Sequence, residues 1–171
     1  INGDLTIIGN SILGDSPDTP YNGDTQNNFI DMVFVDVDNN ANTFNSSSAR
    51  FTTSNCNRVV YAGLYWGAVS APANLEPENI KFRVPGAGYR DITADETIDL
   101  IYYKDVTDIV ANSSITGNYW VANISTSEGQ SSAAGWSLVI VYEDPTETRK
   151  YISTFDGFSA VRDSPNNQVD F

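Results

Sequence analysis

Two short runs of aromatic and aliphatic residues, at positions 62–68 and 135–142, place the strongest constraint on the fold of this chain. Each run has the length of one β-strand, carries large apolar side chains at neighbouring positions and is bordered by small residues. This pattern is typical of a strand that is covered on both faces. We therefore predict that the two runs are central strands of a β-sandwich, with Trp66 and Trp136 in its core.

Further strand candidates alternate with turn-forming residues along the chain. The clearest spans residues 79–84, where Ile80, Phe82 and Val84 alternate with two basic residues, as in a half-exposed strand. Residues 85–88 are rich in glycine and proline and are predicted to form a hairpin connection. The other predicted strands are residues 4–13, 31–37, 49–53, 58–68, 89–93, 98–103, 118–124, 136–142 and 150–158.

One segment departs from the strand period. In residues 105–110 the apolar side chains fall at helical spacing behind Asp105, which can cap a first turn, so we predict a short helix there. Twenty aromatic residues (three Trp, nine Tyr and eight Phe) supply the large side chains that a core needs. We predict an all-β fold: a two-sheet jelly-roll or Greek-key β-sandwich of about ten strands with one short helical turn, with residues 1–171 as a single domain.

The net charge of −13, from 22 acidic and nine basic residues, restricts the partners of the chain. Such a surplus of carboxylates repels nucleic-acid phosphates and anionic membrane surfaces. No apolar run reaches the roughly 18 residues of a membrane span. We therefore expect no nucleic acid as partner and no direct membrane insertion. The chain begins without a signal-peptide pattern, which we interpret as a mature or excised segment.

Few of the residue types used in catalysis are present. The chain has no histidine, which removes the histidine general bases and the Ser-His-Asp machinery. Its single cysteine, Cys56, has no partner for a disulfide within the chain and is predicted to be a structural or incidental thiol. Carboxylates are plentiful, and a pair of them can hydrolyse a glycoside. We predict a protein that is not an enzyme, with no catalytic residues, and keep a carboxylate-dependent glycoside hydrolase as an alternative.

One acidic segment has a spacing that suits a metal ion. Oxygen-bearing side chains recur at every second position directly after a predicted strand. Calcium takes six to eight hard oxygen ligands on a flexible loop, and this spacing is similar to the first half of an EF-hand loop. We therefore predict calcium as a cofactor. The candidate ligands are Asp36, Asp38, Asn40 and Asn42.

The segment departs from the EF-hand pattern at two positions. Ala41 stands where the loop glycine is expected, and Ser47 replaces the bidentate glutamate, so a true EF-hand is excluded. A calcium site here needs ligands from another loop. The alternative is a loop of solvated side chains held by Asx turns. The candidates for completing the site are Asp15, Asp18, Asp24 and Asp31.

Three adjacent aromatic pairs raise the question of sugar binding. Neighbouring side chains of a regular strand point to opposite faces, so one member of a pair can face outward and stack on a sugar ring. Aromatic residues in strands are more often part of the core. Both interpretations stay open for Tyr65 and Trp66, for Tyr102 and Tyr103, and for Tyr119 and Trp120.

The order of the motifs resembles the amino-terminal β-sandwich module of very large bacterial surface proteins. These are the adhesins and gliding-associated proteins of Bacteroidetes-type bacteria that are exported by the type IX pathway. The resemblance covers nearly the whole chain. It is carried by residues 2–10, 35–38, 43–49, 62–68, 84–86, 103–107, 134–138, 143–145 and 155–158.

The resemblance implies a location and a role but no catalytic residues. It implies one module of a longer extracellular polypeptide at the cell surface, contributing attachment or structural assembly in an adhesin or filament. The partners it implies are other modules of the same polypeptide, copies of the chain in a filament, and surface glycans or proteins. A carbohydrate-binding module is the alternative, which an exposed aromatic strip beside polar side chains would favour.

Overall fold

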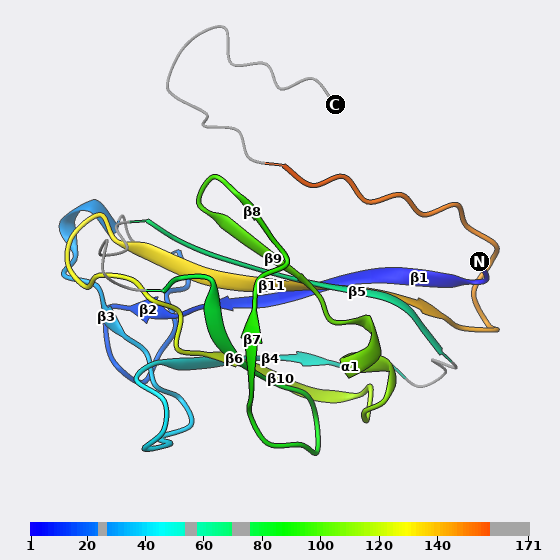
Figure 1. The fold of residues 1–171 in the computed structure, drawn as a ribbon, viewed down its shortest axis with the longest axis horizontal. Coiled ribbons are helices and arrows are strands. Elements are labelled where there is room, and N and C mark those ends of the chain that lie inside the picture. Colours follow the sequence, from blue (N-terminus) through cyan, green and yellow to red (C-terminus); the bar gives the residue numbers. More distant parts are fainter. Residues whose placement is uncertain (24–26, 54–57, 70–75, 158–171) are drawn as a thin grey trace, which may run out of the picture.

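The chain folds into two antiparallel β-sheets packed face to face, with a small two-stranded sheet at one end (Figure 1). The computed structural model describes residues 1–23, 27–53, 58–69 and 76–157. The five-stranded sheet has the order β1 (Gly3–Ser11), β11 (Ala133–Glu143), β5 (Arg58–Val69), β9 (Ile101–Asp105) and β8 (Glu96–Ile98). The four-stranded sheet has the order β4 (Ser46–Phe51), β10 (Gly117–Ala122), β6 (Asn79–Arg83) and β7 (Arg90–Thr93), and the small sheet pairs β2 (Leu13–Gly14) with β3 (Val33–Phe34).

Most neighbouring strands are far apart in sequence. Only β6 with β7 and β8 with β9 form local hairpins in the two large sheets, and the other connections cross from one sheet to the other. Crossing connections of this kind are typical of Greek-key sandwiches. The predicted all-β sandwich is confirmed.

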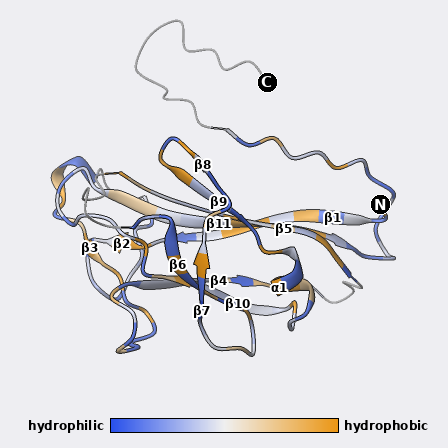
Figure 2. Cartoon of the chain, in the orientation of Figure 1, coloured by the Kyte–Doolittle hydropathy of each residue, from blue (hydrophilic) through white to orange (hydrophobic). Residues whose placement is uncertain are grey.

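The two runs at 62–68 and 135–142 lie side by side at the centre of the five-stranded sheet. In the pairing of β5 with β11, Trp66 lies opposite Trp136 and Leu64 lies opposite Leu138. All four side chains are buried, and the prediction that both tryptophans are core residues is confirmed. The four-stranded sheet covers this inner face with Phe82 and other apolar residues, and Figure 2 shows hydrophobic residues along strands of both sheets.

The outer face of the same two strands is only half-covered. Tyr65, Gly67, Ser137 and Val139 lie on this face, opposite to the tryptophans, and all four are partly exposed. The prediction of complete cover on both faces is therefore wrong for this sheet, because within residues 1–23, 27–53, 58–69 and 76–157 no further strands pack on its outer side.

Two turns lie where the glycine and proline residues of the sequence predict them, and one turn was not predicted. The glycine-rich segment 85–88 connects β6 and β7 as a hairpin, and Gly86 has a φ of 78°, which glycine adopts without strain. β11 ends at Glu143, directly before Asp144 and Pro145, as the proline requires. Predicted strand 98–103 is divided into β8 and β9 by a turn at Asp99, whose φ is 55°.

The last predicted strand is wrong. Lys150 pairs with Ile1 through two backbone hydrogen bonds, but residues 151–157 form no strand. Tyr151 and Phe155 are 94% and 80% exposed. Figure 1 shows this segment turning near the N-terminus and running back above the five-stranded sheet. A strand needs a neighbouring backbone, and the pairing with the N-terminal residues stops at Lys150.

The predicted helical turn is present as α1 (Thr107–Ala111). Val106 and Val110 are buried, and the backbone nitrogen of Val106 donates to the carbonyl oxygen of Ala62 on β5. The predicted cap is wrong by one residue: the N-cap position is Val106, while Asp105 accepts a hydrogen bond from the Thr107 nitrogen at 2.8 Å. Among the described residues no helix has the length and apolar character that crossing a membrane requires.

Candidate functional site

The predicted calcium ligands lie in the loop between β3 and β4, which we call the Asp loop (residues 36–43). The two ends of the loop lie next to each other, because Asp36 forms a β-bridge with Ser46 at the start of β4. Ser46 is fully buried, and its hydroxyl oxygen lies 2.9 Å from Asp36 Oδ1 and 2.9 Å from Asp38 Oδ1. The structure therefore brings two of the four predicted ligands together around one hydroxyl group.

One hydroxyl proton serves two carboxylates at this point. A serine hydroxyl donates one hydrogen bond, so Ser46 satisfies only one of the two aspartates at a time. Burial, together with the nearby Asp38 carboxylate, raises the pKa of Asp36. Burial also acts to raise the pKa of Asp38, but hydrogen bonds from Tyr89, from Ser46 and from the backbone outweigh it, and the net pKa is lowered. The loop therefore stabilises the ionised form of Asp38 more than that of Asp36.

Tyr89, just before β7, supplies the strongest contact to the loop from another element. Its hydroxyl donates to Asp38 Oδ2 at 2.7 Å, across 51 residues of sequence. This partner could not be predicted from the sequence, because tyrosine beside a hairpin is common and nothing in the spacing links it to Asp38. The contact ties the Asp loop to the four-stranded sheet.

Asn40 and Asn42 are directed to one another rather than toward the two aspartates. Asn40 Oδ1 accepts hydrogen bonds from the backbone nitrogen of Asn42 at 3.0 Å and from its Nδ2 at 3.3 Å. The backbone nitrogen of Asn40 donates to Asp38 Oδ1 at 3.2 Å, which is an Asx turn. These contacts fit the alternative of a loop held by Asx turns, and they occupy the oxygen that Asn40 would offer to a cation.

The residues proposed to complete a calcium site are scattered. Asp15, Asp18 and Asp31 are exposed, and Asp24 lies outside the described residues. The loop of Asp15 and Asp18 approaches the Asp loop through its backbone, since the nitrogen of Asp36 donates to the carbonyl oxygen of Pro17 at 2.9 Å. In the described part of the chain, no third Cys, Asp or Glu joins the pair to form a metal-binding group. The Asp36 and Asp38 carboxylates and the Ser46 hydroxyl fit a hard cation in type, and the calcium site stays a prediction.

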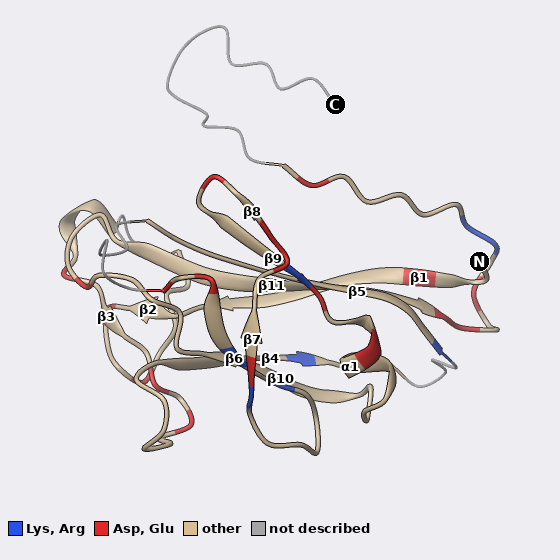
Figure 3. Cartoon of the chain, in the orientation of Figure 1, with Lys and Arg blue, Asp and Glu red and all other residues tan. Residues whose placement is uncertain are grey.

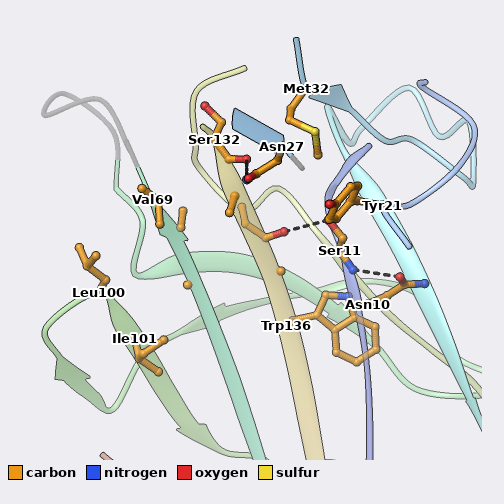
Figure 4. Close-up of a pocket in the computed structure, with 15 residues that line it drawn as sticks. Asn10, Ser11, Tyr21, Asn27, Met32, Val69, Leu100, Ile101, Ser132 and Trp136 are labelled. Atoms are coloured by element: carbon orange, nitrogen blue, oxygen red, sulfur yellow. Dashed lines mark hydrogen bonds between the residues drawn. The ribbon is translucent and has the colours of Figure 1, made fainter. Parts of the chain in front are cut away.

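A groove lies on the outer face of the five-stranded sheet, where Tyr21, Asn27 and Met32 approach the ends of β11 and β5 (Figure 4). Its volume is about 500 Å³. Gly67 and Gly135 lie opposite one another and form its floor, so we call it the glycine groove. A Cβ atom on Gly67 would lie 2.7 Å from the carbonyl oxygen of Leu100, so only glycine permits this close approach. The side chains around the floor are Tyr21, Met32, Val69, Leu100 and Ile101.

Two polar side chains of the glycine groove, Ser11 and Asn27, already have partners in the protein. The Ser11 hydroxyl oxygen lies 2.6 Å from the carbonyl oxygen of Leu13 and 3.2 Å from that of Ala134, and donates its one proton to either of them. Asn27 Nδ2 donates to the Ser132 carbonyl oxygen at 3.0 Å. The groove therefore presents mainly apolar surface, and its polar groups hold the surrounding loops in place.

The aromatic pairs divide between core and surface as strand geometry requires. Trp66 and Tyr102 stack in the interior with ring centroids 5.9 Å apart, while Tyr65 and Tyr103 lie together on the outer face. The Tyr65 hydroxyl donates to Asp156 Oδ2 at 3.0 Å, and this bond holds the segment that follows Lys150 over the sheet. On the other sheet Tyr119 is buried and Trp120 faces outward, with the Arg83 guanidinium 4.3 Å from its ring centre.

Comparisons of the chain with protein-family models, with curated proteins and with solved structures found no match. The resemblance to bacterial surface proteins therefore rests on the sequence motifs alone.

Proposed function

We propose that this domain is a non-enzymatic extracellular module of a large cell-surface adhesin or filament, which contributes attachment or assembly by direct surface contact. The observation that carries the proposal is the outer face of the five-stranded sheet. Its three adjacent strands β1, β11 and β5 contain no charged residue over positions 5–11, 133–142 and 59–69, although the chain has 31 charged residues. Apart from Asp156, which reaches Tyr65 from the segment after Lys150, the strands present a wide uncharged face. Such a face on an acidic protein favours contact with another surface.

Exposed apolar side chains lie on this face. Ile7 is 62% exposed in the middle of β1, and Val69 is 44% exposed at the end of β5. The glycine groove adds an open, mainly apolar surface on the same face. These features support a role in which the domain binds through sheet surface rather than through a deep cavity.

The Asp36 and Asp38 carboxylates are poorly placed for hydrolysis of a glycoside. The close pair Asp36 and Asp38 shares the hydroxyl of Ser46, so no glycosidic bond can lie between the two carboxyl groups. Glycoside hydrolases need their two carboxyl groups on opposite sides of the bond that they cleave. We therefore favour attachment over hydrolysis.

The test compares two matched substitutions of exposed apolar residues. Ile7→Lys places a charge on the uncharged face, and Phe29→Lys places the same charge on a residue that is 79% exposed and lies on the 3-10 turn η1 (Asn27–Phe29). We expect Ile7→Lys to lower adsorption to alkyl-coated beads or self-association in sedimentation velocity by about fivefold or more, because a buried unpaired charge opposes contact. Equal behaviour of the two variants in both measurements would refute the contact role.

Calcium stabilisation of the Asp loop belongs to the same proposal. Two carboxylates that compete for one hydroxyl proton would each gain from a shared cation. Calorimetric titration of chelator-treated protein with calcium tests this, together with the melting temperature. We expect heat of binding and a higher melting temperature, and the absence of both would remove calcium from the proposal.

A further inference from the structure

The strands of the four-stranded sheet differ in charge from the rest of the chain. Its four strands contain four basic residues and one acidic residue, Asp91, which gives a charge of +3 (4 − 1) in a chain with a net charge of −13. These strands therefore hold four of the nine basic residues of the protein. Figure 3 shows basic residues on strands of this sheet, while acidic residues gather mainly in the loops. The basic residues are Arg50, Lys81, Arg83 and Arg90.

The strand register shows which of these side chains face outward together. Tyr119 and Val121 of β10 point into the core, so Trp120 between them points outward. Trp120 pairs with Arg83 of β6 on one side and with Ser48 of β4 on the other. The next outward pair joins Asn118 to Arg50. Diagonal neighbours in a sheet lie within reach of long side chains, so one surface patch includes both arginines and Trp120.

Arg83 is held in place without an acidic partner. Its guanidinium carbon lies 4.3 Å from the ring centre of Trp120 and 4.9 Å from that of Tyr89, which is a cation–π arrangement with two rings. Tyr89 is in turn fixed by its hydrogen bond to Asp38. Neither Arg83 nor Arg50 forms an ion pair with any described residue, whereas Lys81 is paired with Asp91 at 2.7 Å. An ordered guanidinium with free N–H groups is ready to bind a carboxylate through two hydrogen bonds.

We propose that this patch, formed by Arg50, Arg83, Trp120, Ser48 and Asn118, binds a glycan that carries a carboxylate, such as a uronic acid. The arginines bind the carboxylate, and the serine, asparagine and indole groups contact the sugar hydroxyls and ring. The net charge of the chain disfavours a dense polyanion, but a single carboxylate experiences mainly the local charges, because physiological salt screens charges beyond about 8 Å. The proposal rests on the attachment role proposed above and names a ligand class for it.

Binding of trigalacturonic acid, measured by calorimetry, tests the proposal. Arg83→Gln keeps much of the side-chain length but removes the charge, and we expect it to weaken binding at least tenfold. Arg149→Gln is the matched control, because Arg149 is exposed, lies outside this sheet and has no ion pair with a described residue. We expect this control to bind within twofold of the unchanged protein. Trp120→Leu removes one ring that holds Arg83 and is expected to weaken binding by a smaller factor.

The proposal would be overturned by no binding of the trisaccharide to the unchanged protein, by equal binding of the carboxyl-reduced trisaccharide, or by equal binding by the Arg83→Gln variant. Binding of a hexaglutamate peptide as tight as that of the trisaccharide would also overturn it, because the face would then recognise acidic polypeptide. These substitutions leave Ile7 and the uncharged face unchanged, so failure here is distinguishable from failure of the contact role.

Discussion

The indole nitrogen of Trp136 on β11 donates a hydrogen bond to the hydroxyl oxygen of Ser47 on β4, at 2.9 Å, and so joins the two sheets through the middle of the core. Trp136 is 5% exposed and Ser47 is fully buried. A buried N–H group without a partner costs free energy, so this serine compensates for the only polar atom of the tryptophan side chain. The sandwich therefore depends on a polar contact between its layers as well as on apolar packing.

Ser47→Ala should lower the free energy of unfolding by about 1–3 kcal/mol, because it leaves the Trp136 N–H group buried without an acceptor. Urea denaturation monitored by tryptophan fluorescence measures the change. Ser48→Ala is the control: Ser48 faces the outer side, is half-buried, and should change stability by less than about 0.5 kcal/mol. A Ser47→Ala variant as stable as Ser48→Ala would show that the indole finds another acceptor.

Gly67→Ala should destabilise the five-stranded sheet by about 1–3 kcal/mol. The added methyl group would meet the carbonyl oxygen of Leu100 at 2.7 Å and Ile101 Cδ1 at 3.0 Å, so the backbone of the turn between β8 and β9 must move. Gly88→Ala provides the control, since a Cβ at this position has no heavy atom within 4 Å. We expect Gly88→Ala to be neutral or slightly stabilising, and thermal unfolding followed by circular dichroism compares the two.

Equal melting temperatures of Gly67→Ala and Gly88→Ala would show that the turn at Leu100 can move without loss of stability. In that case the floor of the glycine groove would be adaptable, and its shape would not depend on glycine. A loss of stability confined to Gly67→Ala would instead show that the close approach of Leu100 to β5 is part of the fold.

Asp36→Asn should stabilise the chelator-treated protein at neutral pH, measured as a rise in melting temperature. The substitution removes a carboxylate whose pKa is raised by burial and by Asp38, and the new amide can donate to Asp38 Oδ1 while its oxygen still accepts from Ser46. Asp31→Asn changes the net charge equally at an exposed position and should have little effect.

The same pair of variants tests the calcium proposal from the other side. If calcium binds between Asp36 and Asp38, Asp36→Asn should reduce the calcium-induced rise in melting temperature, whereas Asp31→Asn should retain it. If Asp36→Asn is less stable than the unchanged protein in the absence of calcium, the interpretation that the ionised Asp36 carboxylate lowers the stability of the fold is contradicted.

Strands that pair over their whole length were predicted well from the sequence, because their side-chain pattern is repeated over many residues. The predicted strand 58–68 is β5 (Arg58–Val69), and 79–84 is β6 (Asn79–Arg83). Predicted strand 31–37 is reduced to the two residues of β3. Its backbone groups bond to separate loops instead, as in the bond from the Val35 nitrogen to the Ile12 carbonyl oxygen. Such a segment buries apolar side chains as a strand does, while its backbone groups bond to irregular partners. Its sequence pattern therefore resembles that of a strand.

The candidate sites were less accessible to sequence reasoning because they combine distant segments. Asp36 and Asp38 were found from their spacing. Ser46, which contacts both carboxylates, belongs to the following strand, and Tyr89 lies just before β7. Arg83 was predicted as an exposed strand residue, yet its stacking on Trp120 depends on the register between β6 and β10. A register of this kind follows from long-range pairing, which the sequence does not state.

Acid should destabilise the protein as the pH falls below about 5, through carboxylates that are paired with basic side chains. Hydrogen bonds from Lys150, Lys104 and Arg58 lower the pKa values of Asp4, Asp95 and Glu143, respectively. The folded state therefore binds fewer protons than the unfolded state in this range, and stability is lost as pH falls through the lowered pKa values. The raised pKa of Asp36 acts in the opposite sense, because folding favours its protonated form.

Removing one of these pairs should make the response to acid weaker. Asp4 Oδ2 lies 2.8 Å from Lys150 Nζ, where the chain returns to the N-terminus, so Asp4→Asn should give a shallower fall of melting temperature between pH 6 and about pH 3. The salt dependence should also decrease, because exposed ion pairs are screened. Asp18→Asn, at an exposed loop position, is the control for the lost charge. If both variants lose stability along the same curve as the unchanged protein, the Asp4–Lys150 pair contributes nothing to acid sensitivity.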